Sequence, residues 1–333
     1  MIGTEFLKGQ GLGNQLFCYV SARCIATDLG YEFGTAGQEQ LAVNIHSKKG
    51  MYFMDMDLGR PVLDISGFDI YREAEERLYL KSCVHDMTYG CYVSGADERL
   101  YQIGDNTLIY GNFQSERYFR HHREAIKEWL KVKEEYDSYE FSKENLCIMN
   151  VRGGEYVDNR TLFLRRKYWL DAMKNMRSIR QDMEFMIVTD DVEAAKRLLP
   201  SIPAYHFDLA KDYVTIKNAR YLILSNSTFA FFPAFTSETA ERIIAPKYWA
   251  RHNVSNGYWA SEQNIYENFI YQDRQGRLFT AEECREELKK YKEKENKSRS
   301  DRRYKDREIR MRAAEDRILY YVDKAVGKVR GMI

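Results

Sequence analysis

The sequence predicts an α/β protein whose chain forms two domains. Three observations support this fold class: a glycine-rich turn leading into a helical stretch near the N-terminus, an alternation of strands and helices from Leu146 onward, and a length of 333 residues. A chain of this length exceeds what one hydrophobic core usually serves. We therefore expect one domain over residues 1–140, a second over residues 141–280, and a charged helical tail over residues 281–333.

The N-terminal turn contains three alternating glycines and precedes an apolar stretch that ends near Leu29. Glycines let backbone amides approach a ligand closely, and the following helix directs its partially positive N-terminus at whatever binds there. The turn therefore favours an anion, although tight packing without a ligand explains the same glycines equally well. The residues concerned are Gly9, Gly11 and Gly13.

The same turn approaches a dinucleotide-binding fingerprint, because the acidic Glu32 follows about twenty residues later. Asn14 stands where that pattern has its third glycine, and the preceding strand would be the short, partly polar stretch Thr4–Lys8. An NAD-dependent oxidoreductase is therefore an alternative function.

The remaining elements follow from periodicity and capping residues. Thr107–Tyr110 is expected to be a strand, and Ser115 is expected to cap a helix that runs to about Lys133. In the second domain, alternating apolar runs and helices predict a parallel sheet covered on both faces. Its expected elements are strand Leu146–Val151, helix Arg166–Met176, strand Glu184–Thr189, helix Val192–Leu199, a short segment Ala204–Phe207, helix Asp212–Asn218 and strand Tyr221–Ser225.

Ligands of such sheets bind at the carboxyl ends of the strands. Arg152 follows the first of these strands, and its planar guanidinium suits a diphosphate, although an internal ion pair is the alternative. Glu155 could orient Arg152, accept a proton from a substrate hydroxyl, or be merely exposed. Asp190 and Asp191 could bind ribose or base donors, or Asp191 could only cap the next helix.

The last strand of this series precedes hydroxyl and aromatic side chains. Ser227 and Thr228 could hold phosphate oxygens through their hydroxyls and amides, or could serve only as N-caps. Phe229 begins an aromatic cluster whose later members, Phe231, Phe232 and Phe235, are expected in the core.

Composition excludes several classes of protein. The formal net charge of +1 gives no reason to expect nucleic acid as a partner. The six cysteines lack CxxC spacing, and we expect reduced thiols in a cytoplasmic protein. The histidines form no HExxH pattern, so no metal site is expected, and neither a GxSxG elbow nor a P-loop occurs.

Beyond about Thr280 the tail is rich in glutamate, lysine and arginine and is expected to be a solvated helix, until an apolar-periodic segment begins at Ile318. A basic amphipathic helix over residues 313–333 could lie on the inner face of the cell membrane. Packing on the body of the protein or on a second subunit is the other interpretation.

Taken together, five segments resemble the α-1,2-fucosyltransferases of glycosyltransferase family 11 and the wider fucosyltransferase superfamily. They are Gly11–Phe17 (GxGNQxF in the family), Gly111–Phe119 (GYxQSEKYF), Asn150–Tyr156 (HxRRGDY), Val188–Asp191 (a strand ending in SDD), and Asp212 with Asn226–Phe229 (NSTF). Three positions depart from the family pattern, where Asn150 replaces histidine, Gly153 replaces the second arginine and Glu155 replaces aspartate.

The resemblance implies a GT-B arrangement, in which two Rossmann-like domains face a cleft. It also implies an inverting, metal-independent transfer of fucose, or a related sugar, from a GDP-sugar to a glycan hydroxyl, without a cofactor. Arg152 and Glu155 would be catalytic. The implied donor-binding residues are Gly11, Gly13, Asn14, Gln15, Arg152, Asp190, Asp191, Asp212, Ser227, Thr228 and Phe229. A protein that binds nucleotide or glycan without catalysis is a further alternative.

Overall fold

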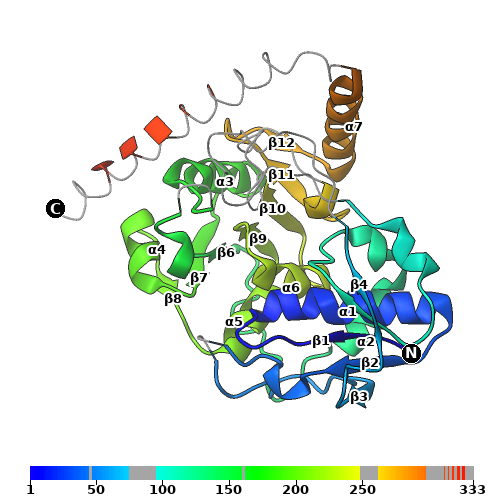
Figure 1. Ribbon diagram of the computed structural model, residues 1–333. Helices are drawn as coiled ribbons and strands as arrows, with labels where there is room; N and C mark the ends of the chain where they lie inside the picture. Colours follow the sequence, from blue (N-terminus) through cyan, green and yellow to red (C-terminus); the bar gives the residue numbers. More distant parts are fainter. Residues whose placement is uncertain are drawn as a thin grey trace.

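The computed structural model describes residues 1–44, 47–74, 95–159, 162–247 and 262–297, and scattered positions between 311 and 326. In these residues the chain forms two sheets, the first from the N-terminal half and the second from the C-terminal half (Figure 1). Every strand pair but one is parallel, and helices connect the strands, so the expected α/β class is confirmed.

The first sheet has the strand order β3-β2-β1-β5-β4. Because the order reverses between β1 and β5, the segments that leave these two strands meet at the same edge. Those segments are the glycine-rich turn and the Gly111–Phe119 stretch. The strands are β1 (Ile2–Glu5), β2 (Phe33–Ala36), β3 (Arg60–Val62), β4 (Asp69–Arg72) and β5 (Thr107–Tyr110).

The first strand differs in its bounds from the stretch Thr4–Lys8 that the dinucleotide-binding alternative would require. It runs from Ile2 to Glu5, with Ile2, Gly3 and Thr4 buried between β2 and β5. The chain leaves the sheet after Glu5, and Lys8 is already in the exposed turn.

The second sheet has the order β12-β11-β10-β9-β6-β7-β8. Counted from β6 as the first strand, this is the 3-2-1-4-5-6 order of a Rossmann fold with an antiparallel β12 added at one edge. Its switch point lies between β6 and β9. The strands are β6 (Leu146–Val151), β7 (Glu184–Thr189), β8 (Ala204–Tyr205), β9 (Tyr221–Leu224), β10 (Arg242–Pro246), β11 (Ile270–Gln272) and β12 (Leu278–Phe279).

Helices cover both faces of the second sheet, as the central strands β6 and β9, buried along their whole length, require. On one face, α3 (Arg166–Ile179) and α4 (Val192–Leu198) build a core around Trp169 and Met176. The other face carries α5 (Leu209–Lys217) and α6 (Phe231–Phe235), which turn toward the first sheet.

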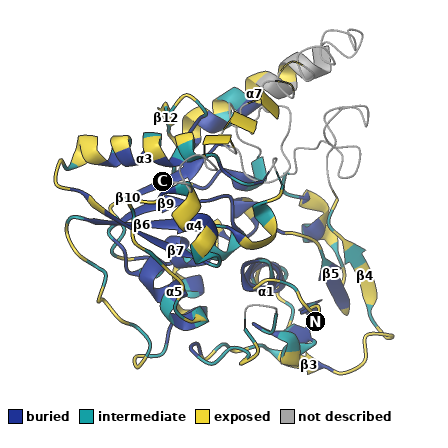
Figure 2. Ribbon diagram, turned by 90° about the vertical axis from the view of Figure 1, so that its left-hand side faces the viewer, coloured by how far each residue is buried: buried dark blue, intermediate teal, exposed yellow. Residues whose placement is uncertain are grey.

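Helix α1 (Leu12–Leu29) lies between the two sheets and is buried on nearly all sides, as the dark blue colour in Figure 2 shows. Phe17 stacks on Phe231 at 4.7 Å between ring centroids and also contacts Phe119. The fully buried rings of Phe231, Phe232 and Phe235 therefore join the cores of the two halves, which confirms them as core residues.

The helix expected from Ser115 to about Lys133 is broken in the structure. Two 3₁₀ turns, Glu116–Tyr118 and Arg120–His122, precede a short α2 (Arg123–Trp129). Ser115 makes no capping hydrogen bond through its side chain, so that prediction was wrong. Phe119, between the turns, has an irregular backbone that buries its ring against α1 and α6.

Helix α7 (Ala281–Lys297) opens the charged tail and packs partly on the second sheet. Ala281, Cys284 and Leu288 are buried, and Glu287 forms an ion pair with the fully buried Lys247 of the sheet. The expectation of a solvated helix therefore holds only for the outer face of α7.

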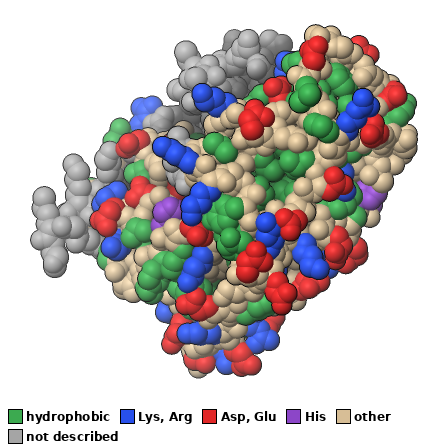
Figure 3. All heavy atoms as spheres, turned by 90° about the horizontal axis from the view of Figure 1, so that it is seen from below, with side chains coloured by type: hydrophobic (Ala, Val, Ile, Leu, Met, Phe, Trp, Pro, Cys, Tyr) green, Lys and Arg blue, Asp and Glu red, His purple; other side chains and the backbone are tan. Residues whose placement is uncertain are grey.

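The segment 313–333 lies mostly outside the described residues, as do His46, His85, His252, Cys83 and Cys91. Among the described helices, none combines the length and the apolar character that a membrane crossing requires. On the face seen in Figure 3, acidic and basic side chains are interspersed and form no continuous basic area.

The contact at Gly13 generates a prediction about stability. A Cβ at this position would lie 2.3 Å from the Thr228 carbonyl carbon, whereas a Cβ at Gly11 would meet no atom within 4 Å. Gly13→Ala should destabilise the protein by about 1 to 3 kcal/mol, the usual cost of overpacking. Denaturant unfolding measures this change, and Gly11→Ala is the matched control. Equal unfolding free energies for the two variants would contradict the tight contact.

Candidate active site

A cavity of about 300 Å³ lies where the carboxyl ends of the second sheet's strands face the N-terminus of α1. It lies at the switch point of that sheet, the usual ligand position in such folds. The structure therefore brings together most residues that the sequence singled out. Those that line the cavity are Gly11, Gly13, Asn14, Arg152, Glu155, Asp190, Asp212, Ser227, Thr228 and Phe229.

The N-terminus of α1 gives the cavity a partial positive charge. Gly11 occupies the N-cap position without a side-chain cap, and the first turn contains no acidic residue that would offset the helix dipole. The first amides of an α-helix have no acceptor within the helix, so these are available to an anion. Asn14 accepts a long hydrogen bond of 3.5 Å from Gln114, which joins the two loops at the edge of the first sheet.

Arg152 is held by two carboxylates at the end of β6. One terminal nitrogen lies 2.7 Å from Asp190 Oδ2 and the other lies 2.7 Å from Glu155 Oε1. Burial lowers the pKa of Arg152, but Asp190 and Glu155 outweigh that effect and raise it, so the side chain stays charged. The two interpretations of Arg152 are thus combined: it forms internal ion pairs and it lines the cavity, with a fifth of its side chain exposed.

Asp190 and Glu155 both act on Arg152. Asp190 also accepts a hydrogen bond of 2.7 Å from the amide of Gly153, which fixes the loop after β6 to the loop after β7. Glu155 orients the guanidinium of Arg152 through its ion pair, which is the first of the three roles expected for it. The side chain of Glu155 is 58% exposed. A carboxylate that is both exposed and anchored at one oxygen can also receive a proton from a substrate.

Two departures from the family pattern have structural explanations. A Cβ at Gly153 would lie 2.5 Å from the Cβ of Asp191, so this backbone leaves no room for a second arginine. Asn150 is buried in the sheet, where its amide accepts from the Ser225 hydroxyl and donates to the Val188 carbonyl. It therefore holds three neighbouring strands together.

Ser227, Thr228 and Phe229 form another part of the cavity wall. Ser227 makes no side-chain capping hydrogen bond, so the interpretation of this hydroxyl as an N-cap is not supported. The backbone of Thr228 and Phe229 contacts Gly13 of α1 so closely that only glycine fits there. The cavity is therefore built jointly by the two halves of the chain.

Asp212 and His206 form a pair at one side of the cavity. His206 Nδ1 lies 2.7 Å from Asp212 Oδ2, and the amide of Phe207 donates to Oδ1 at 3.0 Å. Burial raises the pKa of Asp212 to about 6, although these hydrogen bonds lower it. Sequence reasoning missed His206, yet it follows β8, so the rule that ligands bind at strand ends could have found it.

Three residues considered from the sequence do not line the cavity. Gln15 is fully buried, and its amide group bonds the Gln40 carbonyl and the Ala42 amide, which shapes a loop of the first domain. Asp191 caps α4 by accepting from the amide of Ala194, so its capping interpretation is confirmed. Glu32 pairs with Arg60 on the surface.

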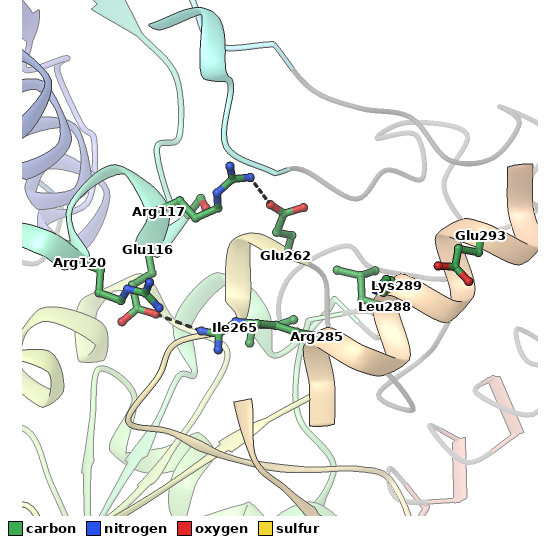
Figure 4. Close-up of a pocket in the computed structure, with 10 residues that line it drawn as sticks. Glu116, Arg117, Arg120, Glu262, Ile265, Arg285, Leu288, Lys289 and Glu293 are labelled. Atoms are coloured by element: carbon green, nitrogen blue, oxygen red, sulfur yellow. Dashed lines mark hydrogen bonds and ion pairs between the residues drawn. The ribbon is translucent and has the colours of Figure 1, made fainter. Parts of the chain in front are cut away.

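A second cavity, of about 520 Å³, lies between residues 115–120 and α7 (Figure 4). Its arginines already face carboxylates: Arg117 bonds Glu262 at 3.1 Å, and Arg285 lies 3.7 Å from the buried Glu116. None of the candidate donor-binding residues lines this larger cavity, whose basic side chains Arg117, Arg120, Arg285 and Lys289 lie among the carboxylates of Glu116, Glu262 and Glu293.

A family comparison agrees with the site geometry. The sequence profile of Glycosyl transferase family 11 matches residues 72–273, which is more than half of the chain and includes β6, β7 and β9. The chain belongs to glycosyltransferase family 11.

The individual proteins to which this family 11 member is similar share little of its sequence. An α-1,2-colitosyltransferase of Escherichia coli is 25% identical over 167 residues, which cover 44% of this chain and 58% of the relative, so the match spans less than two thirds of that protein. Among solved structures, NodZ α-1,6-fucosyltransferase soaked with GDP-fucose has a TM-score of 0.41 at 12% identity, covering 73% of this chain and 93% of that one. POFUT1 in complex with GDP-fucose has a TM-score of 0.42 at 10% identity, covering 73% and 96%.

The raised pKa of Asp212 predicts how the stability of this family 11 member depends on pH. The folded state favours the neutral carboxyl, so the stability it contributes is fully present below the ordinary value of 3.8 and is lost as pH rises toward about 6. From about pH 4 to 7, the unfolding free energy of the wild type should fall by about 2 to 3 kcal/mol relative to Asp212→Asn.

Urea unfolding of both proteins across this range measures the difference. Repeating the comparison in a His206→Ala background removes the imidazole that contacts the Asp212 carboxyl. If the difference in unfolding free energy between the wild type and Asp212→Asn stays constant with pH, the raised pKa of the buried Asp212 carboxyl is contradicted.

Proposed function

We propose that the protein transfers fucose, or a related sugar, from a GDP-sugar to a hydroxyl of a glycan acceptor, with inversion, in the synthesis of surface polysaccharide or O-antigen. The observation that carries the proposal is one cavity in which Arg152, the N-terminus of α1 and the Ser227–Phe229 segment converge at a Rossmann switch point. Family membership supports the reaction class. The colitosyltransferase relative supports an α-1,2 linkage and a deoxy sugar.

Stabilisation of the leaving diphosphate is the proposed source of catalysis. As the glycosyl bond breaks, negative charge grows on the β-phosphate, and fixed donors stabilise that charge more than they stabilise the ground state. Asp190 and Glu155 hold the Arg152 guanidinium in place before the substrate arrives. The first amides of α1 and the hydroxyls of Ser227 and Thr228 would complete the phosphate site, with Asn14 toward the acceptor.

The carboxylates that line the cavity would serve different parts of the substrate. Asp212, at the side of β8 and α5, would accept hydrogen bonds from the N1–H and amine of guanine. Glu155, beside Arg152, would accept the proton of the acceptor hydroxyl, and the leaving diphosphate is the competing base. The positive charge at the diphosphate would come from Arg152 and α1, so the transfer would need no metal ion or cofactor.

The surroundings of the reaction are also part of the proposal. The protein would act in the cytoplasm, with the GDP-sugar and a glycan as partners and no nucleic acid. The protein would also contact the inner face of the cell membrane peripherally through residues 313–333. In support, four residues of this segment that the structure describes expose apolar side chains, which can insert at a membrane surface. These residues are Ile318, Tyr321, Val322 and Val326.

Kinetics of Arg152 variants test the proposal. Arg152→Ala should lower kcat for GDP release from GDP-fucose by about 10² to 10³, as expected for one lost preorganised donor. Arg152→Lys should keep part of the activity, because the charge remains while the planar fork is lost. Arg180→Ala is the matched control, since Arg180 pairs with Asp182 on the surface, away from the cavity.

Transfer by Arg152→Ala at the rate of the wild type would overturn the assignment. GDP binding by the wild type without any transfer to candidate acceptors would favour the alternative of a non-catalytic nucleotide-binding or glycan-binding protein.

A further inference from the structure

Three side chains from two distant parts of the sequence lie close together in the first domain, outside the proposed donor site. Asp28 lies in the last turn of α1, and His121 and His122 lie in the 3₁₀ turn Arg120–His122. His121 Nε2 is 2.8 Å from one carboxylate oxygen of Asp28, and His122 Nε2 is 2.6 Å from the other. One ligand atom from each of the three residues lies within 4.8 Å of the other two.

The chemistry of these atoms suits a divalent transition metal. Two imidazole nitrogens and a carboxylate are ligands that Zn²⁺ prefers, and imidazole also suits Ni²⁺ and Cu²⁺. Metal bonds of about 2.0 to 2.2 Å place neighbouring ligand atoms about 3.3 Å apart in a tetrahedral site, so each imidazole nitrogen needs to move away from the Asp28 carboxylate by only about 0.5 to 0.7 Å. The side chains of His121, His122 and Asp28 are 48%, 20% and 22% exposed, which leaves a path for the ion.

A purely hydrogen-bonded trio is the competing explanation. It requires both imidazoles to present a proton on Nε2 to the same carboxylate while their ring centroids are only 4.3 Å apart. A single divalent ion satisfies both nitrogens and the carboxylate at once, and leaves a fourth position for water.

We propose that Asp28, His121 and His122 bind one divalent transition-metal ion of the Zn²⁺ type. The ion ties the C-terminal end of α1 to the turn before α2. Asp28 is about 20 Å along the helix axis from Asn14, so the site does not belong to the donor cavity. Its role is to fix the helix whose other end forms the phosphate site.

Calorimetric titration of the untagged protein with Zn²⁺ tests the proposal. The wild type should bind one ion at micromolar concentrations. Asp28→Asn and His121→Ala should each weaken binding by at least about 10-fold, since even outer-sphere substitutions cost 10- to 100-fold. His206→Ala is the control and should leave the Zn²⁺ affinity unchanged, because His206 is absent from this cluster.

A thermal-shift series gives a second readout, in which Zn²⁺ should raise the Tm of the wild type but not of Asp28→Asn. The exposed position of His121 makes its variant suitable if Asp28→Asn folds poorly. The proposal is overturned if the wild type does not bind Zn²⁺, if both variants bind it as the wild type does, or if Mg²⁺ at the same concentration stabilises the wild type equally.

Discussion

The contact between Gly13 of α1 and the backbone of Thr228 is the constraint on which the rest of the structure depends. It presses the first turn of a helix from one half of the chain onto the loop that follows β9 in the other half. Only a residue without a Cβ permits this approach. The contact therefore sets the position of the helix N-terminus relative to Arg152, and with it the shape of the cavity.

Charge in the cavity is organised around one arginine. The family pattern that the sequence resembles has a second arginine at the position of Gly153, and the close approach of Asp191 leaves no space for it here. In its place the chain offers the uncompensated first turn of α1 and an Arg152 that two carboxylates hold in position. A fixed guanidinium needs little reorganisation when charge develops on a leaving group.

The sequence allowed the first half of the second sheet to be predicted, because strands buried on both faces appear as short apolar runs between helices, whereas β10, β11 and β12 were not predicted. Strands β6 and β7 match their predicted bounds, and β9 differs by one residue. Arg152, Asp190 and Thr228 were found by the strand-end rule and do line the cavity. Gln15 shares the glycine-rich segment with Asn14 but points into the core, because adjacent helical residues face different directions.

Other features depend on contacts that a single sequence does not display. Helix α1 is buried nearly all round, so it lacks a polar face that would mark its orientation. The irregular turns before α2 form because Phe119 must reach the shared aromatic core. Asp28 and His121 are 93 residues apart, and only the packing of α1 against the Arg120–His122 turn brings them together.

The central claim is that this cavity holds the diphosphate of a guanosine-activated sugar through Arg152 and the N-terminus of α1. Calorimetric titration with GDP and with GMP measures the contribution of the second phosphate directly. The wild type should bind GDP about 10- to 100-fold more tightly than GMP, the range expected for one or two hydrogen bonds to a charged group, and Arg152→Ala should lose most of that preference. Equal affinities for GDP and GMP in the wild type, or an undiminished preference in Arg152→Ala, would contradict the account.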